Sequence, residues 1–510
     1  MDVDDVKQPN TSERFPLPLA IPGAIAAMLV FLRTRGYGML GYDTYPILVS
    51  SRIDSWSDFT GTFTEPLMDG RFTGLFYRPL LNLSFALDNW IWGMDAVGYQ
   101  LTNALLFGAG GFTVALLARR VAGPAVRCAP WVAALVFLTH PLAIEVLPVP
   151  ARRPELLCVL FLTAALARIP RSPAERTIRR GLEVGLFTLL AIASKETGLL
   201  APGLAFALSF LSPQAAAFFV RAKRAILDAL PCLAVALLMI AARWPVLGGL
   251  GGHPETGSSV PLGGLIEALH AIVRSLAAPT GAIPATATTI LLGVGLAGCV
   301  VAAVMTRRRG HTAALRLTSF GALWILSMWI VFAGAGRIAP WYLLIPSVGW
   351  ALLLAAAAAI AETALSSRAL AIRAVAGIAA MALTVLLAWQ AFFGPCLRGY
   401  PEWSLATEAH ETFLGELATK INASGDGSAI EAPPLPRWVQ PANDGARLSG
   451  GAILTDYSVQ ALADLVYEER NVQVRFARPQ DSAVVRPEPW NVLVLLTTAR
   501  PGFEGPGRQR

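Results

Sequence analysis

The clearest shortage in this sequence is charge. Only 15% of its 510 residues are Asp, Glu, Lys or Arg, whereas ordinary soluble domains carry about 25%. Hydrophobic residues make up 55% of the chain. So few charged groups cannot cover the surface of a fold of this size, which excludes a water-soluble protein. The composition predicts that a membrane is the solvent for most of the chain.

Metal-binding patterns are also missing. The five cysteines form no Cys-x-x-Cys pair, and neither they nor the five histidines have the spacing of a metal site. The glycines at 248–252 and 263–264 lack the strand and helix context of a phosphate-binding loop, which favours a flexible outer loop. We therefore expect no cofactor. A divalent metal held by Asp43 and a second acid of the same loop is the alternative left open.

The N-terminus lacks the basic segment and the Ala-x-Ala site of a cleaved signal peptide, so the apolar run at 16–32 is predicted to be a retained span. Apolar runs of about 20 residues recur from there to near residue 394. They predict about eleven transmembrane helices. After the first run, the second predicted span ends near 118 and the third begins near 129. The others cover 155–167, 182–194, 197–212, 225–246, 284–305, 314–334, 341–361 and 374–394.

The net charge of +7 comes from short basic bursts between spans, which argues against nucleic acid as a partner and for a role in orientation. The bursts in every second connection are Arg119, Arg120 and Arg127; Arg168 to Arg180; Arg221 to Arg224; Arg307 to Arg316; and Arg368 with Arg373. The positive-inside rule places them in the cytoplasm, although Arg33 and Arg35 oppose this orientation. We expect a bacterial inner-membrane protein with a cytoplasmic N-terminus.

These patterns predict an all-α polytopic membrane domain over residues 1–394, in which 33–97 form the first extracytoplasmic loop. The composition then becomes polar and proline-rich. Residues 395–510 are expected to form a small extracytoplasmic α/β domain with a disordered tail. Its predicted elements are strands at 452–454, 472–476 and 491–497 and a helix at 458–469.

A set of ionisable residues at the outer ends of the spans is not explained by hydropathy. Charges beside apolar runs are costly unless they are paired or hydrated, so they mark candidate functional sites. Arg and Lys bind phosphate, and a carboxylate beside them can act as a general base. This chemistry suits a phosphate-bearing membrane lipid and an acceptor that arrives from the aqueous side. The set comprises His140, Glu145, Arg153, Glu155, Lys195, Glu196, Arg337 and Tyr342, with Asp43 and Arg78 in the first loop.

The ordered motifs around these residues resemble those of the multi-span GT-C glycosyltransferases. The most similar group is the tetratricopeptide-linked transmembrane O-mannosyltransferases with their bacterial relatives. The resemblance covers residues from about 40 to 350. Its motifs are Tyr-Arg-Pro-Leu at 77–80, Gly-Tyr-x-Leu-x-Asn at 98–103, His-Pro-x-x-x-Glu at 140–145 with Arg-Pro-Glu at 153–155, Ser-Lys-Glu at 194–196, and Arg337 with Tyr-Leu at 342–343 and Pro-Ser-x-Gly at 346–349.

The resemblance implies transfer of a sugar from a polyprenyl-phosphate donor, with an acid of the first outer loop as catalytic base. In this sequence that residue is Asp43. The family commonly has an acidic pair here, but the second position is Thr44. Three readings stay open: one carboxylate suffices, another loop acid (Asp54, Asp58 or Asp69) assists, or activity has been lost. No 34-residue repeat occurs, so the acceptor, whether protein, glycan or lipid, is not implied.

In the expected mechanism, cations stabilise the phosphate that leaves. The candidates are Arg153, Lys195 and Arg337, with Arg78 and Tyr342 beside them. Glu145, Glu155 and Glu196 are expected to hold these cations in position, and His140 before a proline is typical of a helix-capping residue. Trp341 is expected in an interfacial belt. A transporter or lipid flippase and an inactive relative are the competing hypotheses.

Overall fold

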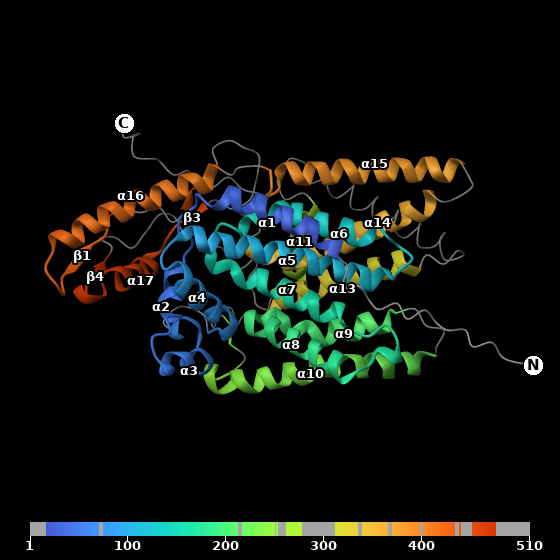
Figure 1. The fold of residues 1–510 in the computed structure, drawn as a ribbon, viewed down its shortest axis with the longest axis horizontal. Coiled ribbons are helices and arrows are strands. Elements are labelled where there is room, and N and C mark those ends of the chain that lie inside the picture. The colour runs from blue at the N-terminus through green and yellow to red at the C-terminus, as the bar shows by residue number, and fades with distance from the viewer. Residues whose placement is uncertain are drawn as a thin grey trace, which may run out of the picture.

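The computed structural model describes residues 17–70, 75–212, 217–249, 251–252, 262–277, 312–334, 339–365, 370–397, 401–433, 438–439 and 451–475. Its longer helices lie roughly along one axis, with α15 at one edge of the bundle and α10 at the other (Figure 1). The bundle helices are α1 (Ile21–Thr34), α5 (Ala96–Ala122), α6 (Ala129–Thr139), α7 (Arg153–Ala167), α8 (Ile178–Ser194), α9 (Ala201–Phe210), α10 (Phe218–Leu247), α11 (Leu262–Ala277), α13 (Thr312–Gly334), α14 (Leu344–Leu365) and α15 (Leu370–Phe393).

Six stretches of the described chain are helical, long and apolar enough to cross a membrane: Leu17–Thr34, Ala96–Ala122, Phe218–Leu247, Ala313–Ala333, Pro340–Leu365 and Ala376–Phe393. Four other predicted spans coincide with the shorter helices α6, α7, α8 and α9. The predicted span at 284–305 lies outside the described residues. Helix α11 begins at Leu262, within the region predicted to be a loop. The fold is therefore mostly helical, as expected for a polytopic membrane protein.

Small residues allow neighbouring helices to approach closely. A Cβ atom added to Gly23 of α1 would lie 2.3 Å from the carbonyl oxygen of Gly108 in α5. In the same way, a Cβ atom on Gly321 of α13 would lie 2.8 Å from the carbonyl oxygen of Gly349 in α14. Such contacts are typical of membrane helices, whose association depends on close packing because the surrounding lipid offers no hydrophobic driving force.

Arginines gather at one end of the bundle and bind the carbonyls where helices stop. Arg120 donates to the carbonyls of Ile169 and Pro170 at 2.7 Å each, just after α7 ends. Arg316 donates to the carbonyls of Val121 and Ala122 at the end of α5. The carbonyls of Val121 and Ala122 are in the last turn of their helix and have no intrahelical donor, and those of Ile169 and Pro170 lie past the end of α7. Residues from four of the five predicted basic bursts thus share one end, here called the arginine end: Arg120, Arg127, Arg171, Arg176, Arg224 and Arg316.

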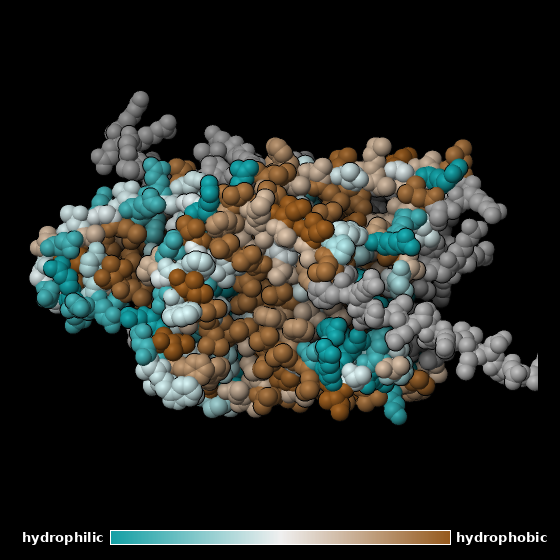
Figure 2. Space-filling view, in the orientation of Figure 1, coloured by the Kyte–Doolittle hydropathy of each residue, from teal (hydrophilic) through white to brown (hydrophobic). Residues whose placement is uncertain are grey.

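The opposite end carries the first loop and the C-terminal region. The loop contains α2 (Thr44–Ser50), α3 (Trp56–Thr64) and α4 (Pro79–Trp92). The C-terminal region contains α16 (Pro401–Ala423), β1 (Ala429–Glu431), β2 (Trp438–Val439), β3 (Gly451–Ala452), α17 (Asp456–Val466) and β4 (Gln473–Arg475). β1 pairs in parallel with β4, and β2 pairs with β3 in the antiparallel sense. Figure 2 shows hydrophilic residues on both ends and a largely hydrophobic band between them.

The predicted strands at 452–454 and 472–476 overlap β3 and β4. These two strands do not pair with each other, because β3 pairs with β2 and β4 pairs with β1. The predicted helix at 458–469 overlaps α17, which begins two residues earlier at Asp456. The predicted strand at 491–497 and the predicted tail lie outside the described residues. A domain boundary between 394 and 395 stays a prediction.

The C-terminal region is docked on the first loop by contacts from two of its helices. His410 of α16 is joined to the Tyr45 hydroxyl of α2 at 3.1 Å, and Glu468 after α17 accepts from Arg52 at 2.9 Å. The backbone N–H of Gly38 donates to the Thr407 hydroxyl at 3.2 Å. The first loop and the last described residues therefore form one continuous structure.

The docking of α16 is expected to weaken in acid. Burial lowers the pKa of His410 to about 4, from its usual 6.5. The undocked chain binds this proton more readily, so the stabilisation is complete above pH 6.5 and is lost as the pH falls toward 4. We expect α16 to be cut faster by protease at pH 5 than at pH 7.5, relative to an unstructured substrate. The variant His410→Gln should lose this pH dependence; equal cutting of the wild type at both pH values would contradict the prediction.

Candidate functional site

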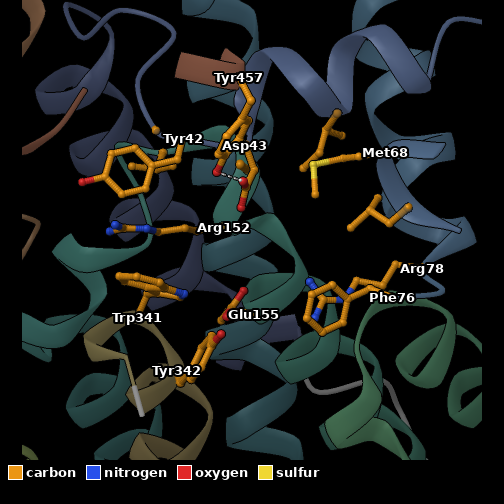
Figure 3. A pocket seen from close by; sticks show the side chains of 15 residues that line it. Tyr42, Asp43, Met68, Phe76, Arg78, Arg152, Glu155, Trp341, Tyr342 and Tyr457 are labelled. Carbon is orange, nitrogen blue, oxygen red and sulfur yellow. Dashed lines mark hydrogen bonds between the residues drawn. The ribbon is translucent and has the colours of Figure 1, made fainter. Parts of the chain in front are cut away.

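A cavity of about 190 Å³ lies at the end of the bundle away from the arginine end. Figure 3 shows the side chains that line it. Four segments line it: the first loop between residues 41 and 78, the turn that leads into α7 at 149–155, residues 341–342, and Tyr457 of α17. Charged and aromatic side chains point into it from opposite sides. The cavity therefore joins polar chemistry from the first loop to the ends of apolar helices.

Asp43 enters the cavity because of the turn before it. Gly41 has φ of +101°, and a Cβ atom there would lie 2.2 Å from Val149, so only glycine fits. Asp43 then occupies the N-cap position of α2, but its side chain makes no capping hydrogen bond. Its Oδ1 accepts a hydrogen bond of 2.7 Å from the Tyr457 hydroxyl instead. The carboxylate is thereby directed into the cavity and not along the helix axis (Figure 3).

Other loop residues considered as partners of Asp43 do not line the cavity. Thr44 is fully buried and donates to the carbonyl of Leu40 at 2.6 Å. Asp58 forms the capping box of α3 with Ser55, and Asp54 pairs with Arg52 at 3.1 Å on the surface. Asp69 has a left-handed backbone, with φ of 54°, in the turn after α3. Among the loop acids, Asp43 is the one that faces the cavity.

Lys195 and Glu155 form a buried ion pair on the opposite wall. Glu155 lies in the first turn of α7, where a negative charge is favoured by the helix dipole. Lys195 follows the end of α8, and its ammonium group lies 4.2 Å from the centre of the Tyr342 ring. Glu155 and Tyr342 both line the cavity, so this predicted trio is brought together.

Arg78 and Glu196 form a second ion pair, with three N–H to oxygen distances of 2.8 to 3.3 Å. Arg78 lines the cavity and also lies over the Phe76 ring at 4.3 Å. Arg243 of α10, which the sequence analysis did not select, lies 3.7 Å from Oε1 of Glu196, an oxygen that Arg78 also contacts. The predicted role of Glu196 as a holder of cations agrees with this geometry.

The two adjacent arginines before α7 have different surroundings, and the expectation for Arg153 is corrected. Arg153 is fully buried away from the cavity, where it pairs with Asp88 at 2.5 Å and binds Asn103 at 2.9 Å. Arg152 lines the cavity instead. Its guanidinium lies 4.0 Å from the centre of the Trp341 ring and 3.6 Å from Glu145. Trp341, expected in an interfacial belt, is therefore part of the cavity wall.

The remaining predicted residues lie beside the cavity or outside the described part of the chain. His140 accepts from the N–H of Leu142 at 3.3 Å, and its Nε2 lies 2.9 Å from the carbonyl of Leu276, which fits a capping role. Glu145 holds Arg152. Arg337 lies outside the described residues. In the described segments, no three His, Cys, Asp or Glu side chains are grouped so that they could hold a metal ion.

Sequence reasoning missed Arg152, Arg243 and Tyr457. The doublet Arg-Arg at 152–153 offered a signal for the first, but successive residues of a helical turn point about 100° apart, and the sequence does not tell which faces the cavity. Arg243 is a charged residue inside a predicted span, which is a recognised sign of function. Tyr457 carried no signal, because its contact with Asp43 joins residues 414 positions apart.

Among known proteins, the chain is similar to solved structures at low identity. No family model matches the chain, and no curated protein sequence matches it. The oligosaccharyltransferase AglB from Archaeoglobus fulgidus is 16% identical with a TM-score of 0.47; the match covers 89% of this chain and 64% of that one. ArnT from Cupriavidus metallidurans, bound to undecaprenyl phosphate, is 14% identical with a TM-score of 0.45, covering 90% and 89%.

The arabinofuranosyltransferase AftD from Mycobacteria is 17% identical with a TM-score of 0.46, and the match covers 91% of this chain and 32% of that one. The GT-C class stays a prediction of the ordered motifs. This chain spans less than two thirds of the AglB and AftD chains. At these identities and scores, no residue role, substrate or partner is transferred from the neighbours.

Proposed function

We propose that this protein transfers a sugar from a polyprenyl-phosphate donor to a hydroxyl group of an extracytoplasmic acceptor, with Asp43 as general base. The observation that carries the proposal is the cavity in which the Asp43 carboxylate faces the Arg78, Arg152 and Glu155 side chains at the ends of apolar helices. A lipid phosphate can approach such a cavity from the membrane, and an acceptor can reach it from the water.

In the proposed reaction, the acceptor oxygen forms a bond to the anomeric carbon of the sugar while the bond between that carbon and the phosphate oxygen breaks. The bonding electrons leave with the polyprenyl phosphate, and Asp43 takes the hydroxyl proton. Arg78 and Arg152, which line the cavity, stabilise the charge that develops on the phosphate. Lys195, whose ammonium group lies 4.2 Å from the centre of the Tyr342 ring, adds positive charge beside the cavity.

The ion pairs beside the cavity fix its cations before a donor binds. Arg78 and Arg243 pair with Glu196, and Lys195 pairs with Glu155. Placing the cations in advance costs no reorganisation when the phosphate leaves.

For the membrane arrangement we propose eleven spans, which add residues 284–305 and the shorter helices to the six long stretches. The arginine end faces the cytoplasm, because positive residues concentrate on that side of inner-membrane proteins. This orientation places the cavity and the C-terminal region outside the cytoplasm. The sugar and the acceptor are not specified by the residues on which the proposal rests.

The test uses purified protein in liposomes with a radiolabelled polyprenyl-phosphate sugar and an envelope extract as acceptor. Transfer of label from the donor to a product that separates from it on chromatography, whether protein, glycan or lipid, supports the proposal. Movement of the donor across the bilayer without a product would favour a flippase. Binding of the donor without any turnover would favour an inactive relative, the reading that Thr44 suggests.

Arg78→Gln is expected to raise the KM for the lipid donor about 10- to 100-fold, with a smaller effect on kcat. The reason is that a glutamine keeps hydrogen-bonding capacity but removes the charge that meets the phosphate. Initial rates at varied donor concentration measure the effect. Arg35→Gln, an exposed arginine at the end of α1, is the matched control. An unchanged KM in Arg78→Gln would remove this arginine from donor binding.

A further inference from the structure

We propose that Tyr457, in the C-terminal region, is a positioning residue that holds the Asp43 carboxylate in the orientation needed to take the acceptor proton. The site is then complete only when α17 is docked on the first loop. This inference rests on the proposed role of Asp43 and assigns a task to the C-terminal region, which neither the motifs nor the reaction explains.

The geometry begins with the start of α17. Thr455 and Ser458 form a capping box there, which fixes the first turn of the helix. Tyr457 lies within this turn and reaches into the cavity, where its hydroxyl donates to Asp43 Oδ1 at 2.7 Å (Figure 3). Among the described residues of the C-terminal region, it is the one that lines the cavity.

Two further contacts fasten this turn to the residues just before Asp43. The Ser458 hydroxyl donates to the carbonyl of Tyr42, and the N–H of Gly41 donates to the carbonyl of Ile453 at 2.9 Å. The loop that carries the carboxylate and the helix that carries the tyrosine are therefore held against each other on both sides of the Tyr457 contact. Such a fixed arrangement is what a site needs to keep one rotamer of its base.

The chemistry of the contact follows from which group donates. Burial and the neighbouring Asp43 raise the pKa of Tyr457 above its usual value, so its hydroxyl stays protonated and donates. The hydroxyl occupies Oδ1 and leaves Oδ2 for the acceptor proton. The other ionisable groups around the cavity are Tyr42, Arg78, Arg152, Glu155 and Tyr342; they are unchanged when only the Tyr457 hydroxyl is removed.

Tyr457→Phe keeps the ring and removes the hydroxyl. We expect kcat to fall about tenfold, because the carboxylate loses the hydrogen bond that fixes its rotamer, while the KM for the donor stays the same. A role limited to stability would lower the active fraction but leave kcat per folded molecule unchanged.

Tyr467→Phe, at the end of the same helix, is the matched control, and protease resistance of the C-terminal region verifies docking in both variants. Infrared spectroscopy supplies a readout without turnover. The stretching band of the Asp43 carboxylate, identified by its loss in Asp43→Asn, should change frequency in Tyr457→Phe because the carboxylate loses a hydrogen-bond donor. An unmoved band, or equal shifts in both tyrosine variants, would overturn the inference. A moved band in a protein without transfer activity would instead refute the proposed function alone.

Discussion

Replacing Asp43 with asparagine is expected to lower the rate of sugar transfer about 100- to 10,000-fold, the usual contribution of a general base. Asparagine has nearly the same shape and still accepts the hydrogen bond from Tyr457, so the cavity and the docking of α17 should persist. The lost property is the ability to take a proton. The measurement is the initial rate of transfer from labelled donor in liposomes, at saturating donor, for equal amounts of folded protein.

Asp54→Asn is the matched control for this variant. Asp54 belongs to the same loop, but its side chain is 70% exposed and pairs with Arg52 away from the cavity. Its replacement should leave the rate within twofold of the wild type, since surface ion pairs contribute about 0 to 1 kcal/mol. Equal activity of Asp43→Asn and the wild type would remove Asp43 from the reaction and would direct attention to Glu155 as the other cavity carboxylate.

Arg153→Met is expected to destabilise the protein by about 3 to 5 kcal/mol, because it leaves the buried Asp88 carboxylate without its partner. Asn103 and the Ser84 carbonyl lose the same guanidinium. Thermal unfolding in detergent, followed by the loss of soluble monomer, measures the change. The fraction that remains folded should keep the wild-type KM for the donor, because Arg153 does not line the cavity.

The double variant Arg153→Met with Asp88→Leu removes the uncompensated charge and should recover much of the lost stability. Asp88→Leu alone provides the second corner of the cycle, which isolates the coupling between the two side chains. A variant Arg153→Met that unfolds like the wild type but binds donor poorly would restore Arg153 to the phosphate site. It would also show that the donor site extends beyond the residues that line the cavity, toward α4.

Much of the bundle follows directly from the sequence. Apolar runs of bilayer length predict helices, because a backbone in lipid must satisfy its own hydrogen bonds. Ten of the eleven predicted spans coincide with helices, and the eleventh lies outside the described residues. The basic bursts likewise predict that every second connection lies at one end of the bundle. In the structure, Arg120 binds a carbonyl just after α7 ends, and Arg316 binds a carbonyl at the end of α5. These are local properties that neighbouring residues determine.

The candidate site was partly predictable for a related reason. Lys195, Glu155 and Tyr342 lie near the ends of apolar runs, where an unpaired charge is costly, so the sequence indicates that each needs a partner. Topology then requires alternate connections to meet at one end of the bundle. The motifs therefore predicted which residues gather, and the structure decided how they pair: Lys195 with Glu155, and Arg78 with Glu196.

Only the tertiary structure decided which side chains face the cavity. Arg152 lines the cavity, whereas Arg153, the next residue, is buried and pairs with Asp88. The two differ because adjacent positions in a turn point in different directions. Asp43 meets Tyr457 across 414 positions of sequence, and no local pattern encodes that contact. The sequence by itself determined a membrane bundle with a polar cluster at one end; long-range packing determined the geometry that makes that cluster a site.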